Sequence, residues 1–272
     1  MKPLTRLLLL LTAIWIAGCV HQTKFHTTLQ PDGWNAEPLS IACRFAPDAD
    51  LDPATGKPVG DEGYYFYILT DIEGNRDYSN TLSVIMTFKK NPRGHSWILL
   101  ESPQGRLEYG LNGNFGLEKQ HYGEGVYQRF RDNHPNPIAY LWEVMNDGKL
   151  EIGRPDRPPT FVWRMPITKR RYQLIYEYMT QRKYDQFSLK DNNCVDMVSD
   201  AAALAGINLI HRLRLTIPQE TKILGKTLRP WTDPQYRILE FSTPDLLQMD
   251  LRQLAEFGIG SDVTEWYLDL KR

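Results

Sequence analysis

The chain has 272 residues, of which 42% are hydrophobic and 24% charged, and its formal net charge at pH 7 is −1. This composition is typical of a globular protein and excludes a chain that is disordered in bulk. The near balance of acidic and basic residues also excludes the basic footprint of a nucleic-acid-binding protein, so no nucleic-acid partner is expected.

The N-terminus carries the pattern of an export signal. Lys2 and Arg6 come before an apolar run over residues 7–17, which is shorter than a comfortable membrane span. The run ends in Ile16-Ala17-Gly18-Cys19, which resembles the lipobox of bacterial lipoproteins. That resemblance implies cleavage after Gly18 and lipidation of Cys19. An uncleaved anchor and a plain secretory signal are the alternatives.

A lipidated Cys19 would tie the chain to a membrane, because several acyl chains on one residue hold a protein stably to a bilayer. Val20 follows it, in place of the aspartate that retains lipoproteins at the inner membrane. The expected location is therefore the cell envelope, with the protein anchored in the outer membrane and facing the periplasm. Residues 1–18 are interpreted as the signal peptide and residues 19–37 as a polar, lipidated tether.

Residues 38–210 are expected to form the main domain, in which strands come first and helices follow. A turn-rich stretch over 47–63 predicts a surface loop, and 112–137, rich in Gly, Asn and Pro, predicts a long loop. Apolar and β-prone runs separated by turn residues predict an antiparallel meander. The expected strands are Tyr64–Leu69, Thr81–Phe88, His95–Glu101, Arg106–Leu111, Ala139–Val144 and Thr160–Met165.

Helices are predicted where apolar spacing follows a capping residue. Gly206 is a natural stop after the second of them. Residues 211–272 are interpreted as a C-terminal extension packed on the main domain. The expected helices run from Thr168 to about Lys183, from Cys194 to Ala205 and from Thr243 to about Phe257.

Cys194 is the residue with the clearest chemical potential. It follows Asn192-Asn193, where a polar turn enters the second predicted helix. A cysteine at a helix N-terminus feels the positive end of the helix dipole, which favours the nucleophilic thiolate. His95 opens an apolar strand, and a thiolate with an imidazole is the minimum set for cysteine-based acyl transfer. No histidine or cysteine pair has the spacing of metal ligands, so neither a metal nor another cofactor is expected.

A disulfide is the structural alternative to a catalytic thiol. Two cysteines remain if Cys19 is lipidated, and the envelope permits disulfides, so a Cys43–Cys194 bridge is one interpretation. Cys43 lies in a run over 39–45 that looks like a buried strand. A lone cysteine there is more often a small apolar core residue.

The order of these elements resembles a known family. A histidine that opens a strand of a meander, then a helix, then Asn-Asn-Cys at the start of a second helix, is similar to the circularly permuted NlpC-like branch of the papain superfamily. That branch includes YaeF/YiiX-type bacterial lipoproteins and lecithin–retinol acyltransferase-like enzymes. The matching segments are Gly94–Tyr109 and Tyr184–Gly206. The resemblance implies an α+β, papain-like fold in which an antiparallel meander packs against the helix that carries the cysteine.

The resemblance also implies a role for each residue of the site. Cys194 would be the nucleophile, and His95 would hold the thiolate as an ion pair and then protonate the leaving group. Glu108 is the preferred residue to orient the imidazole and Asn112 the alternative, because cross-strand pairing puts both on the face of His95. The Cys194 backbone N–H, supported by Asn193, would meet the oxyanion.

Each of these residues has an ordinary structural interpretation as well. His95 could be a hydrogen-bonded core residue, and Glu108 a solvent-facing strand residue. Asn192 and Asn193 could be a turn residue and a helix cap, since asparagine is a favoured cap.

Two classes of function follow from these alternatives. The first is a lipid-anchored cysteine hydrolase, a peptidase or amidase for peptide or acyl substrates of the envelope, with peptidoglycan peptides as the obvious substrate. Acyl-ester or lipid hydrolysis, or acyl transfer, is the variant within this class. The second is a non-catalytic structural or binding lipoprotein on the same fold, with Cys43 and Cys194 bridged.

Overall fold

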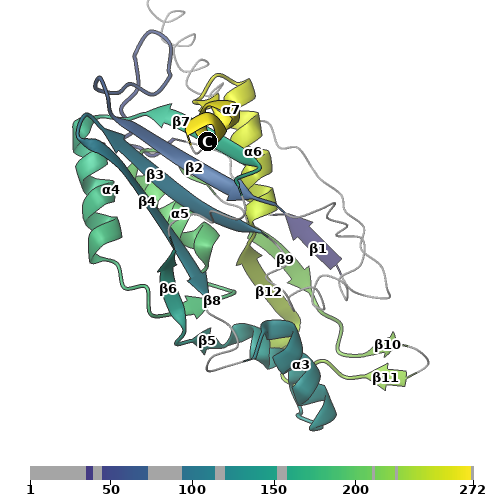
Figure 1. The fold of residues 1–272 in the computed structure, drawn as a ribbon. Helices are drawn as coiled ribbons and strands as arrows, with labels where there is room; N and C mark the ends of the chain where they lie inside the picture. The colour runs from purple at the N-terminus through teal and green to yellow at the C-terminus, as the bar shows by residue number, and fades with distance from the viewer. Residues whose placement is uncertain are drawn as a thin grey trace, which may run out of the picture.

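The structure, a computed structural model, describes residues 35–38, 45–72, 94–113, 120–151, 158–209, 212–223 and 226–270. The fold is mixed α+β, and its main layer is a six-stranded antiparallel sheet (Figure 1). From edge to edge the strand order is β13-β7-β2-β3-β4-β6. The bounds are β2 Tyr65–Asp71, β3 His95–Ser102, β4 Gly105–Gly113, β6 Gly148–Glu151, β7 Phe161–Pro166 and β13 Ser261–Asp262.

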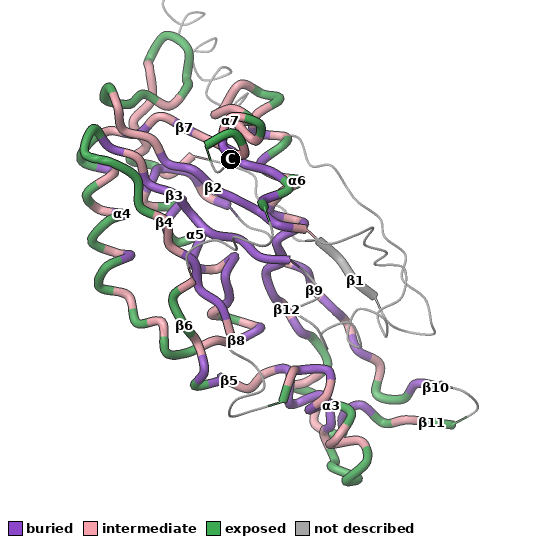
Figure 2. The backbone as a smooth tube through the Cα atoms, viewed as in Figure 1, coloured by how far each residue is buried: buried purple, intermediate pink, exposed green. Residues whose placement is uncertain are grey.

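The centre of the sheet is the antiparallel meander that the sequence predicts. β2 pairs with β3, and β3 pairs with β4 across a tight turn at Pro103 and Gln104. β3 is buried on both faces along most of its length (Figure 2), which explains why its residues form a continuous apolar run. The expected strand Thr81–Phe88 lies outside the described residues.

One face of the sheet is covered by α4 (Lys169–Gln181), α5 (Cys194–Leu204) and α6 (Pro244–Glu256), which share an apolar core with it. The even-numbered residues of β3 face this core. The Thr168 side chain caps α4, whereas Thr243 stands at the N-cap of α6 without a capping hydrogen bond. The three helices predicted from the sequence are therefore confirmed.

The opposite face of the sheet carries the odd-numbered residues of β3. Trp97 and Leu99 pack there with Tyr267 of α7 (Thr264–Leu270). Because successive side chains of a strand point to opposite faces, neighbouring residues of β3 belong to different cores. This alternation decides the geometry of the candidate site.

A smaller sheet with the order β1-β9-β12 stands beside the main one (Figure 1). Its strands β9 and β12 form a separate core with α3 and η2. β1 overlaps the stretch 19–37 that was expected to be a tether, so this stretch ends in a paired strand. The bounds are β1 Asn35–Pro38, α3 Tyr122–Arg131, η2 Pro137–Trp142, β9 Arg212–Thr216 and β12 Ile238–Ser242.

Two predictions for this region are wrong. The stretch 112–137 is not a loop throughout, because α3 occupies part of it and buries Tyr122 and Val126 one turn apart. The stretch expected as a strand over 139–144 is mostly the 3-10 helix η2, which begins at Pro137. Short elements complete the fold: β5 Val144–Met145 with β8 Phe187–Ser188, β10 Thr221–Ile223 with β11 Lys226–Leu228, and η3 Pro234–Arg237.

Residues 211–272 contribute to both sheets. They supply β9 and β12 to the smaller sheet, β13 to the edge of the main sheet, and α6 to its covered face. Within the described residues, no helix combines the length and the apolar character needed to cross a membrane. The predicted signal peptide and Cys19 lie outside the described residues.

Candidate functional site

Cys194 is the first residue of α5, and its neighbours explain why the helix begins there. The Asn193 side chain accepts hydrogen bonds from the N–H groups of Val195 and Asp196, at 2.8 and 3.1 Å. The Asp196 carboxylate accepts in return from the Asn193 N–H at 3.0 Å, which completes a capping box. The cysteine is therefore held at the positive end of a helix of 11 residues.

Asn193 has a structural role in place of the predicted oxyanion support. Its Nδ2 donates to the backbone carbonyls of Leu189 and Ser242, at 3.0 and 3.3 Å, so both amide hydrogens are used. The N–H of Cys194 differs, because it donates to no other group in the described part of the chain. Of the two donors predicted to meet the oxyanion, the Cys194 N–H is thus available among the described residues, whereas the Asn193 amide is already used.

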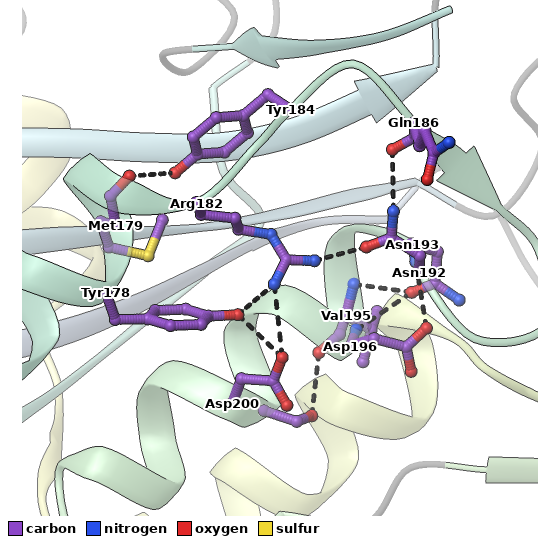
Figure 3. A network of polar contacts seen from close by, with 11 residues as sticks. Tyr178, Met179, Arg182, Tyr184, Gln186, Asn192, Asn193, Val195, Asp196 and Asp200 are labelled. Atoms are coloured by element: carbon purple, nitrogen blue, oxygen red, sulfur yellow. Dashed lines mark hydrogen bonds and ion pairs between the residues drawn. The ribbon is translucent and has the colours of Figure 1, made fainter. Parts of the chain in front are cut away.

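The turn that leads into α5 is fastened by Arg182 (Figure 3). Its guanidinium contacts the Asn192 side-chain oxygen, the Tyr178 hydroxyl and, at 3.4 Å, the Asp200 carboxylate. Asn192 in turn donates to the carbonyl of Gln186 at 2.8 Å. This network joins the end of α4, the turn and the body of α5 into one unit.

The Cys194 thiol is free and buried against β3, with 8% of the residue exposed. It forms no disulfide, and Cys43 lies outside the described residues. Burial raises the pKa of the thiol. The Ser96 hydroxyl and backbone N–H partly oppose this rise, whereas the Asp196 carboxylate adds to it. The thiol that was predicted to be activated is therefore biased toward its neutral form.

Ser96 is the residue of β3 that lies beside the sulfur. It is fully buried, and its hydroxyl makes no hydrogen bond of ordinary geometry among the described residues. Ser96 lowers the pKa of the Cys194 thiol, although no hydrogen bond joins its hydroxyl to the sulfur in the described chain.

His95 does not meet Cys194. It precedes Ser96 in β3 and therefore points to the other face of the sheet. Its ring stacks on Trp97 with 5.5 Å between centroids, and its Nε2 lies 3.1 Å from the position that a Cβ on Gly110 would take. No interaction joins His95 to Cys194 in the described chain. The structure brings their segments together at one end of β3 and leaves the two side chains on opposite faces.

The carboxylate at the imidazole is Glu151 of β6. The Nε2 of His95 lies 3.7 Å from its Oε2, and the Asn112 side chain donates to that same oxygen. Glu151 was not predicted from the sequence, because β6 is a four-residue edge strand without clear alternation. Its place opposite Gly110 depends on pairing with β4 rather than on any local signal.

The preferred orienting residue, Glu108, has other partners. It lies opposite Leu99 in the β3–β4 ladder, where it accepts hydrogen bonds from the Trp97 indole at 3.3 Å and the Tyr267 hydroxyl at 3.1 Å. Trp97 lies opposite Gly110, so the same register continues to place Asn112 opposite His95. Of the two orienting candidates, the structure connects Asn112 to the imidazole through Glu151.

A hollow lies at the far end of α5 from Cys194, beside Arg171 and Gly206. Its polar group is already paired, since the Arg171 guanidinium binds Asp50 at 3.1 Å and the Leu204 carbonyl at 2.9 Å. Among the described residues, no group of three or more His, Cys, Asp or Glu side chains could hold a metal ion.

Comparisons with known proteins add no relative: no family model, no curated protein and no solved structure matches this chain. The likeness to the permuted NlpC-like branch therefore depends on the residues and the element order described above.

Proposed function

We propose that this chain is a lipid-anchored cysteine hydrolase of the cell envelope, a peptidase or amidase in which Cys194 is the nucleophile. The observation that carries the proposal is a free thiol on the first residue of α5, together with an N–H of the same residue that donates to no acceptor among the described residues. Attack by the sulfur on a carbonyl carbon would develop negative charge on the carbonyl oxygen, and that N–H can donate to it.

The arrangement of elements supports a papain-like assignment. α5 packs against β3 and β4 (Figure 1). Ser96, the second residue of the strand that His95 opens, lowers the pKa of the Cys194 thiol. An antiparallel meander followed by the cysteine helix is the order that the permuted NlpC-like resemblance implies. The lipobox-like signal favours an envelope substrate, and peptidoglycan peptides supply amide bonds there. Acyl esters are the variant that the same chemistry would cleave.

In this proposal His95 becomes the base only after the start of β3 rearranges. A strand residue cannot change faces while its strand keeps its register. The start of β3 is paired along one edge in the described part of the chain, because its ladder with β4 begins at Trp97 and His95 and Ser96 pair with β2. Gly94 precedes it with φ of 84°, a conformation that glycine adopts readily.

A non-catalytic structural or binding lipoprotein on the same fold is the second candidate. The observation in its favour is the placement of Cys194 and His95 on opposite faces, with a buried thiol whose pKa is raised. In this case Cys194 is a small core residue, and His95 with Glu151 is a structural pair.

Turnover by the full chain in detergent distinguishes the two candidates. The probes are purified peptidoglycan peptides for amide cleavage and p-nitrophenyl acetate for ester cleavage. Cys194→Ala is expected to lower hydrolysis about a thousand-fold or more, because no other group replaces the nucleophile. Cys43→Ala is the matched control and should keep the wild-type rate. Wild-type turnover by a folded Cys194→Ala variant would rule out the hydrolase proposal.

A further inference from the structure

We propose that Ser96 is the positioning residue for Cys194, holding the sulfur by a hydroxyl contact from the adjacent strand. This inference rests on the proposed function and concerns the arrangement before the start of β3 rearranges, in which the hydroxyl of Ser96, and not the imidazole of His95, faces the thiol. Ser96 would act through Cys194 and would not itself touch the reacting carbonyl.

The geometry of β3 carries the first step. Ser96 is an even-numbered residue of β3, and even positions face the core that contains Cys194. Ile98, the next residue on that face, packs in the same core. Gly110 and Trp97 surround the imidazole of His95 on the other face. Of the two polar residues at the start of β3, Ser96 is therefore the one aimed at the α5 N-terminus.

The second observation is that the buried Ser96 hydroxyl lacks a hydrogen-bond acceptor among the described residues. Ser96 is fully buried, and its hydroxyl makes no ordinary hydrogen bond in the described part of the chain. Its cross-strand neighbour Thr70 donates elsewhere, to the Gln248 side chain at 2.8 Å. A buried hydroxyl without a partner is costly, so a polar acceptor beside it is expected. Cys194 opens α5, which packs against β3 on this face, and Ser96 lowers the pKa of its thiol, so we assign the sulfur as the acceptor for this hydroxyl.

The third step is what such a contact does. A hydroxyl donor stabilises a thiolate more than a thiol, so it opposes the effect of burial on Cys194. It also fixes the direction of the sulfur relative to the unpaired N–H of Cys194. Ser96 keeps its own proton throughout, because it serves as a hydrogen-bond donor and not as a base.

The test is the titration of the Cys194 thiol, followed by carbon-13 NMR of its labelled Cβ in the full chain. This readout does not require reagent to reach a buried sulfur. Ser96→Ala is expected to move the titration midpoint up by about one pH unit, the effect of one lost charge-assisted hydrogen bond. Ser102→Ala, at the other end of the same strand and on the same face, is the matched control and should leave the midpoint unchanged.

The outcomes separate this inference from the proposed function. An unchanged midpoint in a folded Ser96→Ala variant would overturn the inference. A shift produced by His95→Ala but not by Ser96→Ala would overturn it as well, and would show that the imidazole reaches the thiol. If Ser96→Ala shifts the midpoint while Cys194→Ala keeps full turnover, the inference holds and the hydrolase proposal fails.

Discussion

At the scale of single residues, the site depends on which of two neighbouring side chains faces α5. The sequence predicts the strand, the helix and the meeting of their ends, because apolar runs and capping residues are local signals. It does not decide that His95 points away and Ser96 points inward. Since the side-chain period of a strand is 2, one residue of register reverses every face, and register is set by pairing with distant strands.

Gly110 tests the placement of His95. A Cβ there would lie 3.1 Å from the imidazole Nε2 and 2.7 Å from the backbone oxygen of Glu151. Gly110→Ala is therefore expected to lower the free energy of unfolding by about 1–3 kcal/mol, measured by urea denaturation. The double variant with His95→Ala should recover part of that loss, because the imidazole no longer competes for the space. Full stability of Gly110→Ala would place His95 elsewhere.

The buried thiol predicts a pH dependence of stability. The pKa of Cys194 is raised in the folded chain, so the stability that the neutral thiol contributes is complete below the unfolded pKa of about 8.5. It is lost as the pH rises through the folded pKa. Between pH 7 and 10, wild type should lose stability relative to Cys194→Ala in urea titrations. Parallel pH profiles of the two proteins would contradict the raised pKa.

At the scale of elements, prediction succeeds where the signals are local. α4, α5 and α6 begin directly after Thr168, Asn193 and Thr243, although Thr243 makes no capping hydrogen bond, and the β3–β4 hairpin turns where the sequence places it. α3 was missed because its glycines and polar residues obscure a short apolar face. β6 was missed because a four-residue edge strand is defined by its partner, and with it the Glu151 carboxylate was missed.

The Asn193 cap of α5 is expected to contribute measurably to the stability of the fold. Asn193→Ala removes the cap of α5 and two buried bonds to backbone carbonyls, so a loss of about 2–3 kcal/mol in the free energy of unfolding is expected. Asn193→Ser keeps a capping oxygen and should lose roughly half as much. Urea denaturation of the three proteins measures both values. Equal stability of the Ala and Ser variants would mean that the cap contributes nothing.

At the scale of the whole molecule, contacts join segments that lie far apart along the chain. The buried Arg171 guanidinium binds Asp50 and Asp48 of the 47–63 loop and the Leu204 carbonyl at the end of α5. The loop was predicted only as a solvent-facing excursion. The composition of the loop could not show that Arg171 binds it, because Arg171 lies on a helix more than a hundred residues further along the chain.

Arg171 is accordingly the charge whose loss should matter most for stability. Arg171→Met leaves the half-buried Asp50 carboxylate and the Leu204 carbonyl without their donor, so a loss of about 1–3 kcal/mol is expected. Its exposed neighbour Arg170 is the matched control, and Arg170→Met should stay within about 0.5 kcal/mol of wild type. Thermal and urea unfolding measure both. Similar losses of stability in the two variants would contradict a specific role of the Arg171 contacts in holding the loop.

A nucleophilic Cys194 would form an acyl-enzyme with its substrate, and we propose to detect that species by trapping it. The full chain is mixed with p-nitrophenyl acetate, quenched in acid within the first turnover, and analysed by mass spectrometry of the intact protein and its peptides. The proposal predicts one acetyl group on the peptide that carries Cys194, and none in Cys194→Ala. Release of nitrophenol by the wild type without acetyl on Cys194, or an equal adduct in Cys194→Ala, would contradict it.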